Sequence, residues 1–275
     1  MISRRRLLLG AGALGCVNAT GAPSGFDHNY NAWSQLLQRH VVLLRDGKAS
    51  QVRYAGMAAD RTALKRCLQS LSVVEPSAFE KWSLAQQQAF LINAYNAATV
   101  ELILSRYPQL KSIKDLGSVF SSPWKLPWLD LLGRKRSLDD IEHGLLRKPG
   151  VYDEPRIHFA VNCASTSCPM LREEAYTADR LELQLSQQTQ RFMSDRTRNR
   201  WDQSGARLEL SKIFDWYGKD FQQGHQGISS LRAFAASQAD LLADAPADRV
   251  LLRRGRFDIT FLDYDWSLND VSSGS

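Results

Sequence analysis

The chain has 275 residues, of which 44% are hydrophobic and 23% charged, and this balance excludes an intrinsically disordered protein. No apolar run reaches the roughly 18 residues that a membrane-spanning helix needs, so we expect no membrane span. The formal net charge is +6, but three basic residues are adjacent at Arg4–Arg6. In the rest of the chain, basic residues exceed acidic residues only slightly, which gives no reason to expect a nucleic-acid partner.

Residues 1–19 have the layout of a bacterial export signal. Arg4–Arg6 precede a short apolar stretch rich in Leu, Gly and Ala. The order Ser-Arg-Arg-x-Leu-Leu is similar to a twin-arginine signal, which directs export after folding. We therefore expect cleavage after Ala19 and a periplasmic or secreted protein whose single domain spans residues 20–275. An imperfect lipoprotein motif makes a lipid anchor at Cys16 the alternative to simple cleavage.

The first expected elements have helical spacing of their apolar residues. Asp27 to about Leu44 is one such helix, and residues 61–71 form a second one that places Cys67 among leucines. Between them, Val52–Tyr54 is expected to be a short strand. We interpret Cys67 as a packing residue.

The clearest expected element is a helix from residue 84 to about Ser105. Ser83 and Gln86 form a capping box at its start, and its middle is apolar nearly all round, which predicts a central, buried helix. Asn93 and Asn96 lie three residues apart on it. A buried amide costs about 1–3 kcal/mol if left unpaired, so these two side chains must bind something. They either brace an adjoining loop or contribute to substrate binding.

The rest of the chain mixes helices with a few strands. The expected elements are a hairpin within 118–136, a helix from Ser137 to before Pro149, a strand over 156–161, a helix over 177–193, a strand over 208–210, a helix over 229–242 and a strand over 258–262. Helices outnumber strands. The sequence therefore predicts an α+β protein, mostly helical, with a small antiparallel or mixed sheet.

Four ordered segments resemble the family called domain of unknown function 547. They are Leu91–Ala97, Asp140–His143, His158–Ser165 and Phe214–Tyr217, and the resemblance covers roughly residues 80–225. It implies a papain-like fold, as in cysteine peptidases and transglutaminases. The family name itself implies no activity.

The residues in these motifs would allow cysteine hydrolase chemistry. Such an enzyme needs a thiolate, an imidazole to move its proton, and a third group to orient the imidazole. We expect Cys163 as the nucleophile, His143 as the base and Glu142 as the orienting carboxylate, with His158 as the competing base. Because Glu142 and His143 are adjacent on a helix, their side chains diverge by about 100°, which leaves Glu142 free to reach His158 or Cys163 instead.

Substrate-binding residues are expected around the same turn. Backbone N–H groups of residues 164–167, with the amide of Asn93 or Asn96, could form an oxyanion hole. Ser165 and Trp216 are further candidates for substrate contact. Papain-type enzymes place the cysteine before the histidine, at the start of the central helix, whereas here Cys163 follows both histidines. Either the site is rearranged or the fold has lost hydrolase chemistry.

Two other functions remain open. The first is a non-catalytic exported binding module, in which aromatic side chains line a groove for a peptide or glycan; the candidates are Trp124, Trp128, Trp216, Tyr217, Tyr264 and Trp266. The plain alternative is that these aromatics are core residues. The second function is zinc binding by Cys163, His143, His158 and Glu142, although their spacing matches no standard zinc motif.

Two further expectations concern small molecules and thiols. We expect no cofactor, and a substrate that is a small peptide, amide, ester or glycan. Cys163 and Cys168 could form a local disulfide in an oxidising compartment, or one of them could be a reactive thiol.

Overall fold

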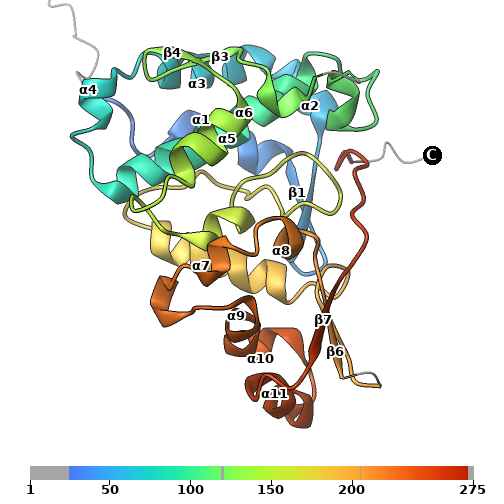
Figure 1. Ribbon diagram of the computed structural model, residues 1–275. Helices are drawn as coiled ribbons and strands as arrows, with labels where there is room; N and C mark the ends of the chain where they lie inside the picture. Colours follow the sequence, from blue (N-terminus) through green and yellow to red (C-terminus); the bar gives the residue numbers. More distant parts are fainter. Residues whose placement is uncertain (1–24, 119–120, 205, 272–275) are drawn as a thin grey trace, which may run out of the picture.

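The computed structural model describes residues 25–118, 121–204 and 206–271 (Figure 1). The expected export signal, residues 1–19, and the alternative lipid site at Cys16 lie outside these ranges. Within them, no helix combines the length and the apolar character that crossing a membrane requires.

The described chain is an α+β structure in which helices predominate, as the sequence predicts. Its α-helices are α1 (Asn31–His40), α2 (Tyr54–Ala59), α3 (Arg61–Ser72), α4 (Pro76–Phe79), α5 (Leu84–Leu104), α6 (Leu138–Ile141), α7 (Leu181–Met193), α8 (Ile213–Trp216), α9 (Leu231–Ser237), α10 (Ala239–Leu242) and α11 (Pro246–Arg253). Short 3-10 helices are η1 (Ile113–Leu116), η2 (Pro123–Lys125), η4 (Pro155–Phe159), η5 (Asp220–Gln222) and η6 (His225–Gly227), and η3 (Glu142–Leu146) is a π-helical turn.

The strands form three small sheets. The strands are β1 (Val41–Leu44), β2 (Ala49–Val52), β3 (Leu129–Leu131), β4 (Arg134–Arg136), β5 (Arg200–Asp202), β6 (Arg207–Leu210) and β7 (Asp258–Phe261). β1 pairs with β2 and β3 with β4, both antiparallel. The third sheet is mixed, because β6 is antiparallel to β5 and parallel to β7.

Helix α5 is the centre of the N-terminal half. The expected capping box is present, since the Ser83 hydroxyl accepts from the Gln86 backbone and the Gln86 side chain accepts from the Ser83 backbone. Every residue from Gln88 to Leu104 is buried, because α5 is surrounded by α1, α3 and α6 (Figure 1). The prediction of a central, buried helix is confirmed.

Two expected elements near the N-terminus have different boundaries. The helix predicted to reach Leu44 ends at His40, and Val41–Leu44 extend to pair with β2. The turn between β1 and β2 is sharp, with left-handed backbone at three residues including Gly47. The strand predicted at Val52–Tyr54 is displaced to Ala49–Val52, and Tyr54 instead begins α2.

The expected strand over 156–161 is wrong. Pro155–Phe159 form the 3-10 helix η4, which Pro155 opens and the Glu154 carboxylate caps at the Arg156 N–H. All five residues of η4 are buried. A short run that is buried on every side carries no periodicity that distinguishes a strand from a helical turn.

Several later elements also differ from prediction. The helix expected from Thr177 begins at Leu181, and the one expected over 229–242 is divided into α9 and α10. Strand β5 and helix α11 have no counterpart among the predicted elements. The strands expected over 208–210 and 258–262 are present as β6 and β7.

The hydrophobic core consists of two clusters, and both α7 and the segment 157–160 contribute residues to each of them. The first surrounds α5, and the second joins α7, β6, η5 and α8–α11; Figure 1 shows α7 between the N-terminal helices and α9–α11. Ile157 and Ala160 belong to the first cluster, whereas Phe159 belongs to the second. The segment that carries His158 and leads to Cys163 is therefore fixed from both sides.

Candidate active site

A cavity of about 250 Å³ holds most of the expected site residues. Its polar lining includes Cys163, Cys168, His143, His158, Glu142 and Asp139. Trp216 also lines it, together with other aromatic residues. Asn93, Asn96 and Ser165 are not among the lining residues.

Cys163 lies in a sharp turn that the neighbouring Asn162 organises. The Asn162 side chain accepts a hydrogen bond from the Ala164 N–H at 2.9 Å and donates one to the Pro169 carbonyl at 2.7 Å. Ala164 has left-handed backbone with φ of 62°, a conformation that costs a non-glycine residue about 1–2 kcal/mol. The turn thus holds the Cys163 side chain, half-buried, at the wall of the cavity.

Three polar side-chain groups surround the Cys163 sulfur. The Cys168 sulfur lies 3.1 Å from it, the Ser165 Oγ 3.2 Å and the Tyr264 hydroxyl 3.3 Å. The Cys168 thiol is the main cause that lowers the pKa of Cys163 to about 7; burial opposes it, and the two hydroxyls add to it. Burial raises the pKa of Cys168 well above its usual value. Of the two thiols, Cys163 therefore ionises first.

Of the two alternatives for Cys163 and Cys168, the local disulfide is not formed. Cys67, Cys163 and Cys168 are all free thiols. Cys67 is buried on α3, as predicted, and burial raises its pKa.

The backbone of the Cys163–Cys168 turn is occupied by contacts within the fold. The Thr166 N–H donates to the Ser267 carbonyl at 2.8 Å, and the Ser167 N–H to the Asp265 carbonyl at 3.2 Å. The Ala164 N–H is bound by Asn162. The N–H groups of Ala164, Thr166 and Ser167 are therefore not available for the expected oxyanion hole. The Ser165 N–H is different, because it hydrogen-bonds Cys163 and helps to lower the pKa of this thiol. It stands beside the sulfur together with the Tyr264 hydroxyl.

Buried Arg198 fixes the same turn from its other side. Its guanidinium donates to the Thr166 carbonyl at 2.6 Å and to the Cys168 carbonyl at 3.0 Å, and it also pairs with Asp195. The C-terminal segment contributes as well, because the Asn269 N–H donates to the Ala164 carbonyl. The two cysteines are thus held in a rigid loop.

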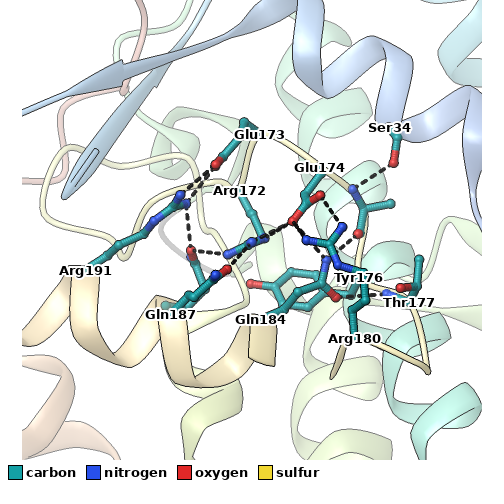
Figure 2. A network of polar contacts seen from close by, with 12 residues as sticks. Ser34, Arg172, Glu173, Glu174, Tyr176, Thr177, Arg180, Gln184, Gln187 and Arg191 are labelled. Atoms are coloured by element: carbon teal, nitrogen blue, oxygen red, sulfur yellow. Dashed lines mark hydrogen bonds and ion pairs between the residues drawn. The ribbon is translucent and has the colours of Figure 1, made fainter. Parts of the chain in front are cut away.

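A polar network anchors the chain that follows the Cys163–Cys168 turn (Figure 2). Buried Arg172 binds the Glu174 carboxylate and the side chain of Gln187 on α7, and Arg191 on α7 pairs with Glu173. Burial opposes ionisation of Glu174, but hydrogen bonds from Arg172 and Arg180 outweigh it and lower the pKa of Glu174 to about 2.

The two asparagines of α5 brace this region. Asn93 donates to the Tyr176 carbonyl at 2.7 Å and accepts from the Tyr176 N–H at 3.0 Å. Asn96 donates to the Ala160 carbonyl at 3.0 Å and accepts from the Asn162 N–H at 2.9 Å. The loop-bracing interpretation is therefore correct, and the structure gives no support for Asn93 or Asn96 as substrate ligands.

His158 forms a histidine–carboxylate pair with Asp220. Its Nε2 lies 2.7 Å from Asp220 Oδ2, and its ring is stacked on Tyr217 with centroids 4.0 Å apart. Burial opposes ionisation of Asp220, but hydrogen bonds from His158 and Arg147 hold its pKa far below the usual range. The other ring nitrogen, Nδ1, lies 4.0 Å from Glu142 Oε1.

Asp220 is the site residue that the sequence analysis missed. It lies three residues beyond the Phe214–Tyr217 motif, and its only signal is that it is an acidic residue among aromatics. Its partner His158 is 62 residues away in the chain.

His143 is differently placed from the expected base. Its Nδ1 accepts a hydrogen bond from the Arg147 guanidinium. Because a guanidinium only donates, Nδ1 carries no hydrogen and the ring hydrogen is on Nε2, which lies 3.7 Å from Asp139. Its side chain is 42% exposed. Glu142 does not orient His143, because the π-helical turn buries Glu142 beside His158 and Tyr217. The structure therefore favours His158 over His143 as the functional imidazole.

Aromatic rings form one wall of the cavity. Trp216, 43% exposed, packs against Tyr264 and Trp266 at centroid distances of 4.8 and 5.5 Å, and Trp124 packs against Trp266. Tyr217 also lines the cavity. Trp128 does not belong to this wall, because it lines a separate cavity beside α5.

The described residues hold no group of three or more His, Cys, Asp or Glu side chains arranged to bind a metal ion. The zinc alternative therefore has no ligand set in this part of the chain. Cys163 is surrounded by a thiol and two hydroxyls instead.

Comparison with known proteins gives one result. Residues 79–193 match the family described as "Protein of unknown function, DUF547". No curated protein and no solved structure matches the chain, so the papain-like fold stays a prediction. The matched range contains α5, Glu142, His143, His158 and Cys163. The similarity to this family extends over residues 79–193, which is less than half of the chain.

Proposed function

We propose that this protein is an exported cysteine hydrolase that cleaves an ester or amide bond through an acyl-thioester on Cys163. The observation that carries the proposal is that one cavity contains a thiolate-stabilised cysteine and an imidazole paired with a carboxylate, His158 with Asp220. These are the components that thiol-dependent acyl transfer requires. The layout of residues 1–19 supports export.

In the first step, the Cys163 thiolate attacks the carbonyl carbon of the substrate. Negative charge then moves from sulfur to the carbonyl oxygen. The Tyr264 hydroxyl, which accepts from the Ser165 hydroxyl, and the Ser165 N–H donate to the thiolate before attack and are then released to donate to this oxygen. One backbone donor of the expected set thus acts together with a side-chain hydroxyl.

His158 handles the proton of the leaving group. Asp220 binds Nε2 and leaves Nδ1 for proton transfer. Among the described residues, no histidine nitrogen hydrogen-bonds to the Cys163 sulfur. Because the thiol of Cys163 is already acidic, His158 is not needed to deprotonate it. It would protonate the leaving group and then activate the water that hydrolyses the thioester.

The shape of the cavity limits the substrate. About 250 Å³ accommodates a small acyl group or one side chain. The wall of Trp216, Trp266 and Tyr264 favours an aromatic, apolar or sugar-ring surface against it. We therefore propose small aryl or glycosylated esters and amides as the substrate class.

A panel of p-nitrophenyl and aminocoumarin derivatives tests the proposal. The wild-type protein should release product with turnover, and a slowly hydrolysed ester should leave an acyl group on the tryptic peptide 157–172, which contains Cys163. Cys163→Ala should abolish turnover. Asp220→Asn should lower it by about tenfold or more while leaving alkylation of Cys163 by iodoacetamide nearly unchanged.

Cys67→Ala is the matched control, because Cys67 is buried in α3 away from the cavity. Its turnover should equal that of the wild-type protein. If Cys163→Ala retains turnover, or if no substrate in the panel yields an acyl adduct on Cys163, the hydrolase proposal is wrong.

A binding module is the second candidate, favoured by the exposure of Trp216 within the aromatic wall. It predicts that Cys163→Ala binds an oligosaccharide or peptide from a ligand panel as tightly as the wild-type protein. It also predicts that Trp216→Ala loses this binding, and that no ligand is turned over. Acyl-enzyme formation by the wild-type protein would decide against it.

A further inference from the structure

Cys163 and Cys168 are a pair of unequal thiols within one turn. Cys163 is half-buried at the cavity wall, whereas Cys168 is only 3% exposed. Their sulfurs lie 3.1 Å apart, and the Cys163 N–H donates to the Cys168 sulfur at 3.0 Å. A reagent that enters the cavity therefore meets Cys163 first, with Cys168 directly behind it. Hydrolysis uses the Cys168 thiol only as a hydrogen-bond partner of Cys163 and requires no bond between the two sulfurs.

We propose that Cys163 and Cys168 form a dithiol that reduces hydroperoxides, with Cys163 as the attacking sulfur and Cys168 as the resolving sulfur. This reaction shares one feature with the proposed hydrolysis, on which it rests: each uses the accessible Cys163 sulfur as a nucleophile. The substrate class is a small hydroperoxide, because the cavity is small and the attacking sulfur lies inside it.

Two steps account for all atoms and electrons. The Cys163 thiolate attacks the terminal oxygen of the hydroperoxide, so that an S–O bond forms and the O–O bond breaks. Sulfur is oxidised to a sulfenic acid, and the alkoxide that leaves takes up a proton to become an alcohol. The Cys168 sulfur then attacks the Cys163 sulfur, forming the S–S bond and breaking the S–O bond. The hydroxide that leaves takes the proton of the Cys168 thiol and becomes water.

The surrounding contacts prepare the second step. A disulfide requires the two sulfurs to approach to about 2.05 Å, which side-chain rotation can provide while the loop stays in place. Arg198 holds the carbonyls of Thr166 and Cys168, and the C-terminal segment holds the N–H groups of Thr166 and Ser167. The resolving thiol is thus fixed beside the sulfur that it must attack.

The reaction also determines when the hydrolase can act. The disulfide would occupy the Cys163 sulfur and prevent acylation. Reduction by a dithiol returns both thiols and restores the nucleophile. Hydroperoxide would therefore switch off acyl transfer reversibly, without change elsewhere in the chain.

Hydrogen peroxide and cumene hydroperoxide, added to the reduced full-length protein, test the proposal. Trypsin releases both cysteines in one peptide, residues 157–172. In the wild-type protein this peptide should become about 2 Da lighter, and dithiothreitol should reverse the change. Oxidation of Met170, in the same peptide, adds mass and is not reversed by dithiothreitol, so the two are distinguished.

Variants assign the two roles. Cys168→Ser should form no disulfide, should react with dimedone at Cys163, and should proceed to irreversible sulfinic acid. Cys163→Ser should leave Cys168 reduced under the same treatment. Cys67→Ala, the matched control, should behave as the wild-type protein does. If a variant fails to fold, the mass of the wild-type peptide still shows whether hydroperoxide forms the Cys163–Cys168 disulfide.

Any of three results would overturn the proposal. In the wild-type protein, Cys163 could accumulate sulfinic acid while Cys168 stays a free thiol, or the peptide could fail to react with either hydroperoxide. In Cys163→Ser, Cys168 could oxidise at the wild-type rate. Failure here is separable from failure of the hydrolase. Acylation of the reduced protein without disulfide formation refutes only the dithiol. Disulfide formation without acylation refutes only the hydrolase.

Discussion

Replacing Tyr264 with Phe tests whether the donors around Cys163 set the reactivity of its thiol. The Tyr264 hydroxyl lies 3.3 Å from the Cys163 sulfur and 2.9 Å from the Ser165 hydroxyl. The variant keeps the ring that packs against Trp216 and removes only the oxygen. The Cys168 thiol, which is the main cause of the lowered pKa, remains in place.

The magnitude follows from the strength of one charge-assisted hydrogen bond. Such a bond contributes about 1.5–3 kcal/mol, and 1.36 kcal/mol corresponds to about one pKa unit. Tyr264→Phe should therefore raise the pKa of Cys163 from about 7 to about 8 or 9. At pH 7 the thiolate fraction would fall from about one half to about one tenth or one hundredth, so alkylation should slow about 5- to 50-fold.

The assay is the rate of iodoacetamide labelling at Cys163, measured on the tryptic peptide 157–172 across a range of pH. The rate should rise with pH through a midpoint equal to the pKa of the thiol. Tyr152→Phe is the matched control, because its hydroxyl binds Gln87 away from the cavity. An unchanged midpoint in Tyr264→Phe, or an equal change in Tyr152→Phe, would refute the reasoning.

Three further predictions concern stability. Asn96→Ala removes both hydrogen bonds of a buried amide and should lower the free energy of unfolding, measured by urea titration, by about 2–4 kcal/mol. The control Gln88→Ala removes a buried amide whose nitrogen has no partner in the described structure, so it should lower the free energy of unfolding clearly less. The pKa of Glu174 is lowered from 4.5 to about 2, so its stabilisation is fully present above about pH 4.5 and is lost as the pH falls towards 2. Glu174→Gln should therefore destabilise the protein at pH 7, by about 1–2 kcal/mol after solvent screening, and not at pH 2; an equal loss at both would contradict the pairing. Trp216→Ala should cost less than about 1 kcal/mol in thermal unfolding because Trp216 is 43% exposed, whereas a loss of about 3–5 kcal/mol would make it a core residue.

Features that depend on a few adjacent residues could be predicted from the sequence. The starts of α5 and α6 were both predictable, because a capping box at Ser83 or Ser137 involves only residues three apart. The burial of α5 was predictable from its uniform apolarity. The boundary at His40 was not, since Val41–Leu44 become a strand only by pairing with β2. Propensity within one segment gives no information on such a partner.

The candidate site divides in the same way. Cys163 and His158 belong to one motif five residues apart, so their common location was predictable. The choice between His143 and His158 depends on one local and one long-range contact. Arg147 occupies Nδ1 of His143 from four residues away, which helical spacing permits. Asp220 binds His158 from 62 residues away, and no local pattern indicates that pairing, so the residue types alone left both histidines open.

The C-terminal segment connects the nucleophile to the rest of the site. Residues 79–193, which match the family, contain Cys163 and both candidate imidazoles, whereas Asp220 and Tyr264 lie beyond them. The segment around Tyr264 pairs with the Cys163–Cys168 turn through backbone hydrogen bonds, so the same residues that complete the cavity wall also hold the nucleophile's loop. A chain cut after residue 193 would keep the sulfur and lose a thiolate donor, the carboxylate on His158 and most of the aromatic wall. The chemistry proposed for Cys163 therefore depends on the chain beyond the family match as well as on the match itself.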